Sequence, residues 1–333
     1  MLNCFVVNDL PNIMFKKILV TGGSGFIGFH LHDYLEHERI VNLDLEEPDF
    51  DYRSTFIRGD VRDSKILVKA LKGCDAIWSM AAAHKDFGIS RDEYFAINEY
   101  GTRILTEAAT AAGIKQFIFF SSVAVYGDSN EPRTEGSPTN PSNDYGASKL
   151  AAERVLEAWA AADSSREVLI IRPVVVYGER NFANVHRLMK QIDKGQYVNI
   201  GVGTNIKSIA YGKNLVQAVL YLLNHMKQGV SVYNYADEPQ LTSRVIGETI
   251  AAALGKSKPK TLPYWLVYTL ALPFDLIKKL TGKDLAISSN RVQKFTTPTY
   301  FRAEKVHEAG FQPSFTNIEG LQNMAKWFKE TEQ

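Results

Sequence analysis

The stretch Thr21-Gly22-Gly23-Ser24-Gly25-Phe26-Ile27-Gly28 decides the fold, because it joins an apolar, strand-like run to an amphipathic helical pattern. Gly22 permits a tight turn, Gly25 lets the backbone approach a pyrophosphate, and Gly28 allows helix and strand to pack closely. The first helical residues, Phe26 and Ile27, would offer backbone N–H groups to the anion. The stretch therefore predicts a phosphate-binding turn between a strand and a helix.

Outward from this turn, short β-branched or aromatic runs alternate with longer helical patterns. We expect strands at 17–21, 40–44, 55–58, 76–79, 117–121 and 168–172. The helical patterns lie near 26–37, 63–72, 91–112 and 144–162. This alternation predicts an α/β fold, a Rossmann-type doubly wound parallel sheet with helices on both faces.

The alternation fades after residue 172. Helical patterns appear at 183–194, 212–226 and 242–254, with strand-like pieces near 196–200 and 230–235. We expect a cofactor-binding domain over 14–173 and a smaller, mainly substrate-binding domain over 174–330, with some segments returning to the sheet. Met14 directly precedes the first strand-like run, so residues 1–13 are interpreted as an extension outside the fold.

Composition narrows the functional class. The 333 residues carry 38 Lys plus Arg against 37 Asp plus Glu, a net charge of +1 that gives no general attraction to nucleic acid. The two cysteines, Cys4 and Cys74, exclude a disulfide framework and a cysteine-rich zinc site, and they favour a cytoplasmic protein without a metal.

The segment 262–272 is the most apolar in the chain, but a bilayer span needs roughly 20 apolar residues. We interpret it as a buried helix or a lid over the substrate site. A peripheral membrane contact is the less favoured alternative.

The second predicted strand ends at Asp44, 16 residues beyond Gly28, where a ribose-binding carboxylate belongs. Such a carboxylate accepts hydrogen bonds from both ribose hydroxyls and repels a 2′-phosphate. Since residues 45–47 supply no arginine, the pattern favours NAD over NADP.

Tyr145 and Lys149 stand four residues apart on a predicted helix, so their side chains share one face. A nearby ammonium can stabilise the tyrosine phenolate and make it a proton acceptor near neutral pH. Ser122 follows the preceding strand, at the sheet edge where ligands bind, and could hold the reacting oxygen. These three residues form the predicted catalytic constellation.

Taken together, these motifs resemble the extended short-chain dehydrogenases/reductases, and more narrowly the NAD-dependent epimerase/dehydratase family that acts on nucleotide sugars. The resemblance rests on TGGSGFIG at 21–28, Asp44, Asp60-Val61, Met80-Ala81-Ala82, NEYGT at 98–102, SSVAVYG at 121–127, YGASK at 145–149 and RPVVVYG at 172–178.

The resemblance implies catalytic roles for Ser122, Tyr145 and Lys149, and NAD as the cofactor. It places Asp60 and Val61 at the adenine, Ala81 and Ala82 along the cofactor, and Pro173 near the nicotinamide. Asn98 would make a structural bond within the Rossmann half. Helices 91–112 and 144–162 resemble those that pair in family homodimers.

The reaction follows less directly. Dehydratases of this group usually carry an acidic residue just after the serine or threonine, whereas Val123 follows Ser122 here. We therefore favour epimerisation of a nucleoside-diphosphate sugar, a UDP-sugar first, at C4 through a transient 4-keto intermediate. A 4-keto-sugar nucleotide reductase is the alternative, and a 3β-hydroxysteroid or sterol dehydrogenase a further one.

The chain departs from the best-known 4-epimerase pattern in its predicted substrate contacts. Lys207 could meet a diphosphate, with Arg291 as a second phosphate contact. Asn181 or Asn184 could replace a nucleotide-sugar asparagine absent from 172–178. His84 could touch cofactor or substrate, although a loop histidine with a local partner is the favoured interpretation.

Overall fold

The structure, a computed structural model, describes residues 15–84, 88–281 and 288–332. The predicted extension over residues 1–13 lies outside these ranges.

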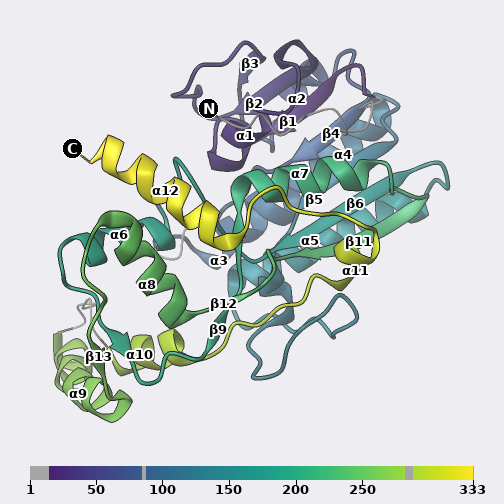
Figure 1. Ribbon diagram of the computed structural model, residues 1–333. Coiled ribbons are helices and arrows are strands. Elements are labelled where there is room, and N and C mark those ends of the chain that lie inside the picture. Colours follow the sequence, from purple (N-terminus) through teal and green to yellow (C-terminus); the bar gives the residue numbers. More distant parts are fainter. Residues whose placement is uncertain (1–14, 85–87, 282–287, 333) are drawn as a thin grey trace.

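Seven parallel strands form one sheet in the order β11-β6-β5-β4-β1-β2-β3 (Figure 1). Their bounds are β1 Ile18–Thr21, β2 Ile40–Asp44, β3 Thr55–Arg58, β4 Ala76–Ser79, β5 Gln116–Phe120, β6 Glu167–Pro173 and β11 Gly229–Tyr235. Strands β2 and β3 follow β1 on one side, and β4, β5 and β6 lie on the other, so the strand order reverses between β1 and β4. This reversal places a ligand crevice at the carboxyl ends of β1 and β4. The predicted doubly wound sheet is confirmed, and its first six strands differ from the expected ranges by one residue at most.

Alternating strand residues feed two separate cores, because successive side chains point to opposite faces. Ile18 and Val20 face a cluster closed by α1 Phe26–Leu31 and α7 Gly212–Leu223, whereas Leu19 faces the cluster on the other side. That second cluster is closed by α2 Ser64–Ala70, α4 Gly101–Ala111 and α5 Asp144–Ala161. The sheet is therefore covered on both faces, which explains its nearly continuous apolar strands.

The carboxyl-terminal residues build a smaller lobe and also return to the sheet. The lobe core packs α6 Asn184–Asp193, α8 Ser243–Leu254 and α12 Asn317–Thr331 around β7 Val175–Tyr177 and β10 Ile209–Tyr211. Short strand pairs complete it: β8 Asn199–Ile200 with β13 Thr261–Leu262, and β9 Ile206–Lys207 with β12 Leu241–Thr242. The returning segments are α7, β11 beside β6, and α11 Glu304–Glu308.

Two predicted helices are less regular than expected. The pattern at 26–37 gives a helix only as far as Leu31, followed by turns and a 3-10 turn at His37–Arg39. The pattern at 91–112 is divided into α3 Arg91–Phe95, a π-helical stretch Ala96–Tyr100, and α4. The π-helical stretch buries the polar side chain of Asn98, which apolar periodicity alone does not predict.

Of the two forms predicted for 262–272, the buried helix is wrong, and the lid over the substrate site stays a prediction. Leu262 ends β13, and residues 264–272 fall in α9 Tyr264–Thr281, which packs against α10 Ser289–Thr296 at the outer end of the smaller lobe. Trp265 and Leu270 are largely exposed, and Ala271 is buried. Among the described residues α10 is its main packing partner, and the exposed apolar side chains of α9 do not enter a core. Within the described ranges, none of the helices has the length and apolarity needed to cross a membrane.

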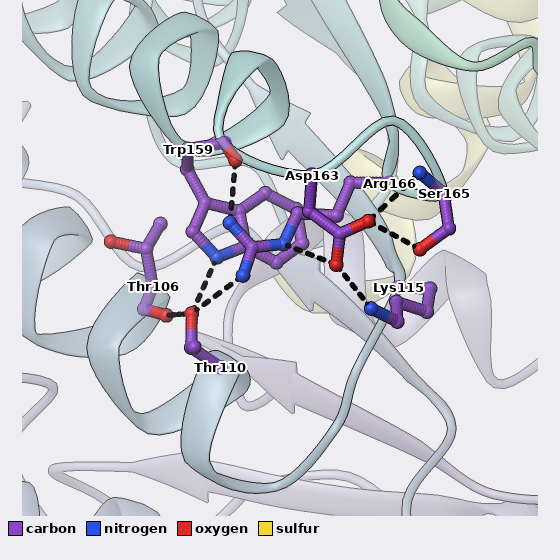
Figure 2. A network of polar contacts seen from close by, with 7 residues as sticks. All are labelled: Thr106, Thr110, Lys115, Trp159, Asp163, Ser165 and Arg166. Carbon is purple, nitrogen blue, oxygen red and sulfur yellow. Dashed lines mark hydrogen bonds and ion pairs between the residues drawn. The ribbon is translucent and has the colours of Figure 1, made fainter.

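The far end of α5 is fixed to α4 by a polar network, shown in Figure 2. The guanidinium of Arg166 lies 4.4 Å from the Trp159 ring centroid and donates to the Trp159 carbonyl at 2.6 Å. The indole Nε1 of Trp159 donates to Thr110 Oγ1 on α4 at 2.9 Å, and Asp163 accepts from Lys115. The network fixes the carboxyl end of the helix whose amino end carries Tyr145 and Lys149.

Candidate active site

The glycine turn has the geometry of a phosphate cradle. Gly22 has φ +75°, and a Cβ there would lie 2.6 Å from the Ala81 nitrogen, while a Cβ on Gly28 would lie 2.0 Å from the Gly23 oxygen. Helix α1 begins at Phe26 after Gly25, which brings no capping side chain. Only glycine allows the turn and the helix to approach this closely. The backbone N–H groups at the start of α1 can then donate to a pyrophosphate, so the residues fit that group.

Asp44 lies at the end of β2, directly beside this turn. Its Oδ2 accepts from the Ser24 N–H at 3.0 Å, and its Oδ1 accepts from the Leu45 N–H at 2.7 Å. Each carboxylate oxygen can accept a further bond, so the group can still bind ribose hydroxyls. Arg58, paired with Asp44 across β2 and β3, donates to the Leu45 carbonyl at 3.2 Å. Arg58 was not expected from the sequence, because it lies on the adjacent strand and not among residues 45–47 directly after Asp44.

Asp60 and Val61 follow β3 at the position predicted for adenine. Arg62 donates to Asp60 from Nε at 2.9 Å and from Nη2 at 2.6 Å, and these hydrogen bonds lower the pKa of Asp60. Asp60 is thus held as a carboxylate, the form that accepts from an amino group. The adenine contact itself stays a prediction.

The loop after β4 lies against the glycine turn. The Ala81 N–H donates to the Thr21 carbonyl at 2.9 Å, so Ala81 and Ala82 border the cradle. His84 is exposed, and its Nδ1 lies 3.2 Å from the Ala82 carbonyl. A local partner for this histidine agrees with the favoured interpretation.

Asn98 joins this loop to the helix that carries the predicted acid/base pair. Its Oδ1 accepts from the Ala83 N–H at 2.8 Å, and its Nδ2 donates to Ser148 Oγ at 2.9 Å. Asn98 thus has the structural role predicted for it.

Ser122 and Tyr145 are brought together by a close backbone contact. Ser122 precedes the 3-10 turn Val123–Tyr126, where its Oγ accepts from the Ala124 N–H at 3.1 Å. Tyr145 lies in the first turn of α5, and the next residue, Gly146, packs on that 3-10 turn. A Cβ on Gly146 would lie 2.4 Å from the Ala124 oxygen. The serine loop and the tyrosine helix can approach this closely only because residue 146 is glycine.

We expect Gly146→Ala to lower kcat/KM by about 10²-fold. The added Cβ must move by about 1 Å to reach an ordinary contact, and a displacement of this size between reacting groups has that effect. Steady-state kinetics checks this. Gly136→Ala is the matched control, since its Cβ would meet only Thr134 Oγ1 at 3.8 Å. Equal activity of the two variants would contradict the positioning role.

Lys149, one turn along α5 from Tyr145, is almost fully buried. Its Nζ donates to the Phe120 carbonyl at 2.5 Å and lies 4.5 Å from the Phe119 ring centroid. Burial lowers the pKa of Lys149 to about 7, although the charge of Glu153 opposes the shift. A phenolate at Tyr145 would favour the ammonium form, so the two groups can stabilise each other's charged state.

A buried ion pair lies one turn further along the same face of α5. Glu153 accepts from Arg172 Nε at 2.9 Å and Nη2 at 2.5 Å, and from the Ser121 hydroxyl. Arg172 Nη1 donates in turn to the Tyr126 hydroxyl at 2.9 Å. Burial lowers the pKa of Arg172, but the bonds and charge of Glu153 outweigh it and keep the pKa above its ordinary value. The pair joins α5, β6 and the serine loop behind the site.

A cavity of about 300 Å³ opens beside Ser122, between the sheet edge and the smaller lobe. Pro173, predicted near the nicotinamide, ends β6 directly before two of its lining residues. The cavity is lined by Ser122, Val123, Ala124, Gly127, Asp128, Ser142, Asn143, Val174, Val175, Ser208, Thr299 and Phe301. Sequence patterns missed Asp128, Ser208 and Thr299, because they come from segments without a motif.

The predicted substrate residues are not among those lining this cavity. Asn181 bonds locally, donating to the Val176 carbonyl at 3.0 Å, and Asn184 accepts from Arg187 at 2.8 Å. Lys207 donates to the carbonyls of Lys294 at 3.1 Å and Thr297 at 2.7 Å, and burial lowers the pKa of Lys207 to about 8. Arg291 lies on α10, where its N–H is capped by Ser288. Their contacts with substrate stay predictions.

A family model described as the NAD dependent epimerase/dehydratase family matches residues 18–236. The chain belongs to this family. Its cofactor is therefore NAD, and the predicted enzyme class is confirmed. The match spans the glycine turn, Asp44, Ser122, Tyr145 and Lys149.

Two curated relatives extend the likeness over nearly the whole chain. One, an N-acetyl-alpha-D-glucosaminyl-diphospho-ditrans,octacis-undecaprenol 4-epimerase of Escherichia coli O157:H7, is 41% identical over 92% of this chain and 94% of its own. The other, a UDP-glucose 4-epimerase of Vibrio cholerae, is 31% identical over 94% of this chain and 95% of its own.

A solved structure agrees in fold. The UDP-glucuronic acid 4-epimerase from Bacillus cereus, in complex with NAD, superposes with a TM-score of 0.75 at 23% identity, covering 95% of this chain and 100% of that one. At this identity the likeness supports the architecture alone.

Proposed function

We propose that the protein is an NAD-dependent 4-epimerase that acts on a sugar carried on a diphosphate, through a transient 4-keto intermediate. The observation that carries the proposal is the apolar wall beside Ser122. Val123 and Ala124 line the cavity where a dehydratase would place an acid, while Tyr145 and Lys149 share one face of the adjoining helix. Both curated relatives are named 4-epimerases, and each name places the sugar on a diphosphate.

In this proposal Tyr145, as phenolate, takes the proton of the C4 hydroxyl and later returns it. Lys149 stabilises the phenolate, and Ser122 holds the C4 oxygen in both directions. NAD, when bound, supplies the acceptor and donor of the hydride. The smaller lobe would hold the keto sugar loosely enough to turn over before the proton is returned.

The proposed cofactor site combines the glycine turn after β1 with the carboxyl ends of β2, β3, β4 and β6 and the amino-terminal part of α5. Its residues are Gly22, Gly25, Phe26, Ile27, Gly28, Asp44, Asp60, Val61, Ala81, Ala82, Tyr145, Lys149 and Pro173. We further propose a cytoplasmic homodimer paired through the exposed faces of α4 and α5, by analogy with the family.

We expect epimerisation without added cofactor. Purified protein incubated with UDP-N-acetylglucosamine, UDP-glucose or N-acetylglucosaminyl-diphospho-undecaprenol should give the C4 epimer of at least one of them. The same equilibrium ratio should be reached from either epimer, as chromatography against both standards will show. Turnover confined to a 4-keto sugar with stoichiometric NADH or NADPH would instead establish a reductase and contradict the proposal.

A further inference from the structure

Helix α9 exposes a set of large apolar side chains, here called the apolar face of α9. The face consists of Trp265, Leu270, Leu272, Phe274 and Ile277. Trp265 is 66% exposed and Leu270 59%. The helix lies at the outer end of the smaller lobe, away from the seven-stranded sheet (Figure 1). Large apolar patches on a surface mark sites of interaction.

Among the side chains of α9 that the structure describes, Ala271 is buried and Leu266, Val267 and Tyr268 are half-buried. The larger part of the described apolar surface lies on the exposed side of the helix, the reverse of the usual arrangement in a surface helix. Asp275 accepts the Ser289 N–H at 3.2 Å, which ties the polar side of α9 to the start of α10. An outward apolar stripe of this kind is typical of a surface that another apolar surface covers.

Positive charge flanks the apolar face. From 256 to 281 the sequence holds five lysines and a single acidic residue, Asp275. Lys260 precedes the helix and Lys279 lies near its end, both exposed. Lys256 and Lys258 make surface ion pairs with Asp193 and Glu248, at 3.0 Å each, which water and salt screen. Apolar groups between lysines, with Trp265 and Tyr264 at one end, match the interface of an anionic bilayer.

We infer that the apolar face of α9 docks on an anionic lipid leaflet as a peripheral contact. The sequence alone favoured a buried helix or a lid over a peripheral membrane contact, and the exposure of these side chains reverses that preference. A second copy of the chain fits less well, because a two-fold contact would oppose the same lysines. A leaflet offers both the apolar depth for Trp265 and Leu270 and the negative headgroups for Lys260 and Lys279.

The position of α9 gives this docking a consequence, which rests on the proposed function. α9 packs on α10, and the chain leaving α10 reaches Thr299 and Phe301, which line the cavity beside Ser122. A docked α9 would therefore connect the membrane surface to the active site through one short segment. A sugar whose diphosphate is linked to a membrane lipid would be the substrate class suited to this arrangement.

Vesicle binding tests the docking independently of catalysis. The full-length protein is mixed with vesicles of phosphatidylcholine containing phosphatidylglycerol, and with vesicles of phosphatidylcholine alone, and bound protein is measured by flotation. We expect binding to the anionic vesicles that weakens with salt. Combined Trp265→Ser, Leu270→Ser and Phe274→Ser should lower the partition coefficient at least about tenfold.

Two further variants sharpen the test. Val68→Ser with Ile318→Ser removes exposed apolar groups from α2 and α12, and should leave binding unchanged. Trp265→Phe should keep binding but lose the blue shift of tryptophan emission that the wild type shows with vesicles. This follows because Trp78 and Trp159 are already buried and Trp327 is half-buried on α12 against Phe182, so Trp265 is the exposed one of the four tryptophans.

Equal flotation of the wild type and the triple variant would overturn the inference. So would a triple variant that changes only the oligomer mass in light scattering, since the face would then bind a second copy. If vesicles bind but no sugar is epimerised, the docking stands and the proposed function fails. If UDP-sugars are epimerised but no vesicle binds, the proposed function stands and the docking inference fails.

Discussion

Tyr145→Phe should lower kcat of the proposed epimerisation by about 10²–10⁴-fold, because the variant removes the group that takes and returns the proton of the C4 hydroxyl. The phenol occupies the first turn of α5, held close to Ser122 by the contact of Gly146 with Ala124. Lys149, one turn along α5, should retain its bond to the Phe120 carbonyl in the variant. Phenylalanine keeps the ring of Tyr145, so the measured loss of kcat reports the contribution of the hydroxyl.

The control for this variant is Tyr100→Phe, which removes the same hydroxyl from a tyrosine that is 50% exposed on the π-helical stretch. It should keep full activity. NAD binding, measured by isothermal titration calorimetry, should persist in both variants. Persistent binding separates a chemical role of Tyr145 from a folding defect. Turnover of Tyr145→Phe within a few-fold of wild type would remove Tyr145 from its assigned role.

The parallel sheet could be predicted from sequence because its strands are buried on both faces. Runs such as Ile18–Thr21 and Ala76–Ser79 are buried throughout and apolar up to their last residue, and the glycine turn identifies which run comes first. The irregular helices could not be predicted equally well. At Ala96–Tyr100 a buried Asn98 with tertiary partners determines the backbone, and apolar spacing carries no record of those partners.

The candidate site likewise contains residues that the sequence predicts and residues that it does not. Ser122, Tyr145 and Lys149 belong to sequence motifs, and their segments meet because α5 packs on the 3-10 turn that follows Ser122. The cavity lining includes Ser208 and Thr299, which come together only when the smaller lobe folds. Arg58 was missed for a related reason, because strand pairing places it beside Asp44 from 14 residues away in the chain. Long-range contacts of this kind have no local signal.

Arg172→Met should destabilise the protein by about 3–5 kcal/mol, since it leaves the carboxylate of Glu153 buried without its partner. Both side chains are nearly or fully buried, with the carboxylate held by two guanidinium bonds and the Ser121 hydroxyl. Methionine fills a similar volume, so the loss is mainly electrostatic. Against a total stability of about 5–15 kcal/mol, such a loss would approach unfolding at room temperature. Urea denaturation followed by circular dichroism measures it.

Arg103→Met provides the matched comparison, because Arg103 pairs with Glu99 at 3.2 Å in an exposed i, i+4 arrangement on the same half of the molecule. Its loss should be below about 1 kcal/mol, as water solvates the freed carboxylate. The double variant Glu153→Leu with Arg172→Met should recover much of the stability lost in Arg172→Met, since no buried charge is then left. If Arg172→Met and Arg103→Met were equally stable, the ion pair between Glu153 and Arg172 would not hold α5 against β6. The positioning of Lys149 would then depend on the bond to the Phe120 carbonyl instead.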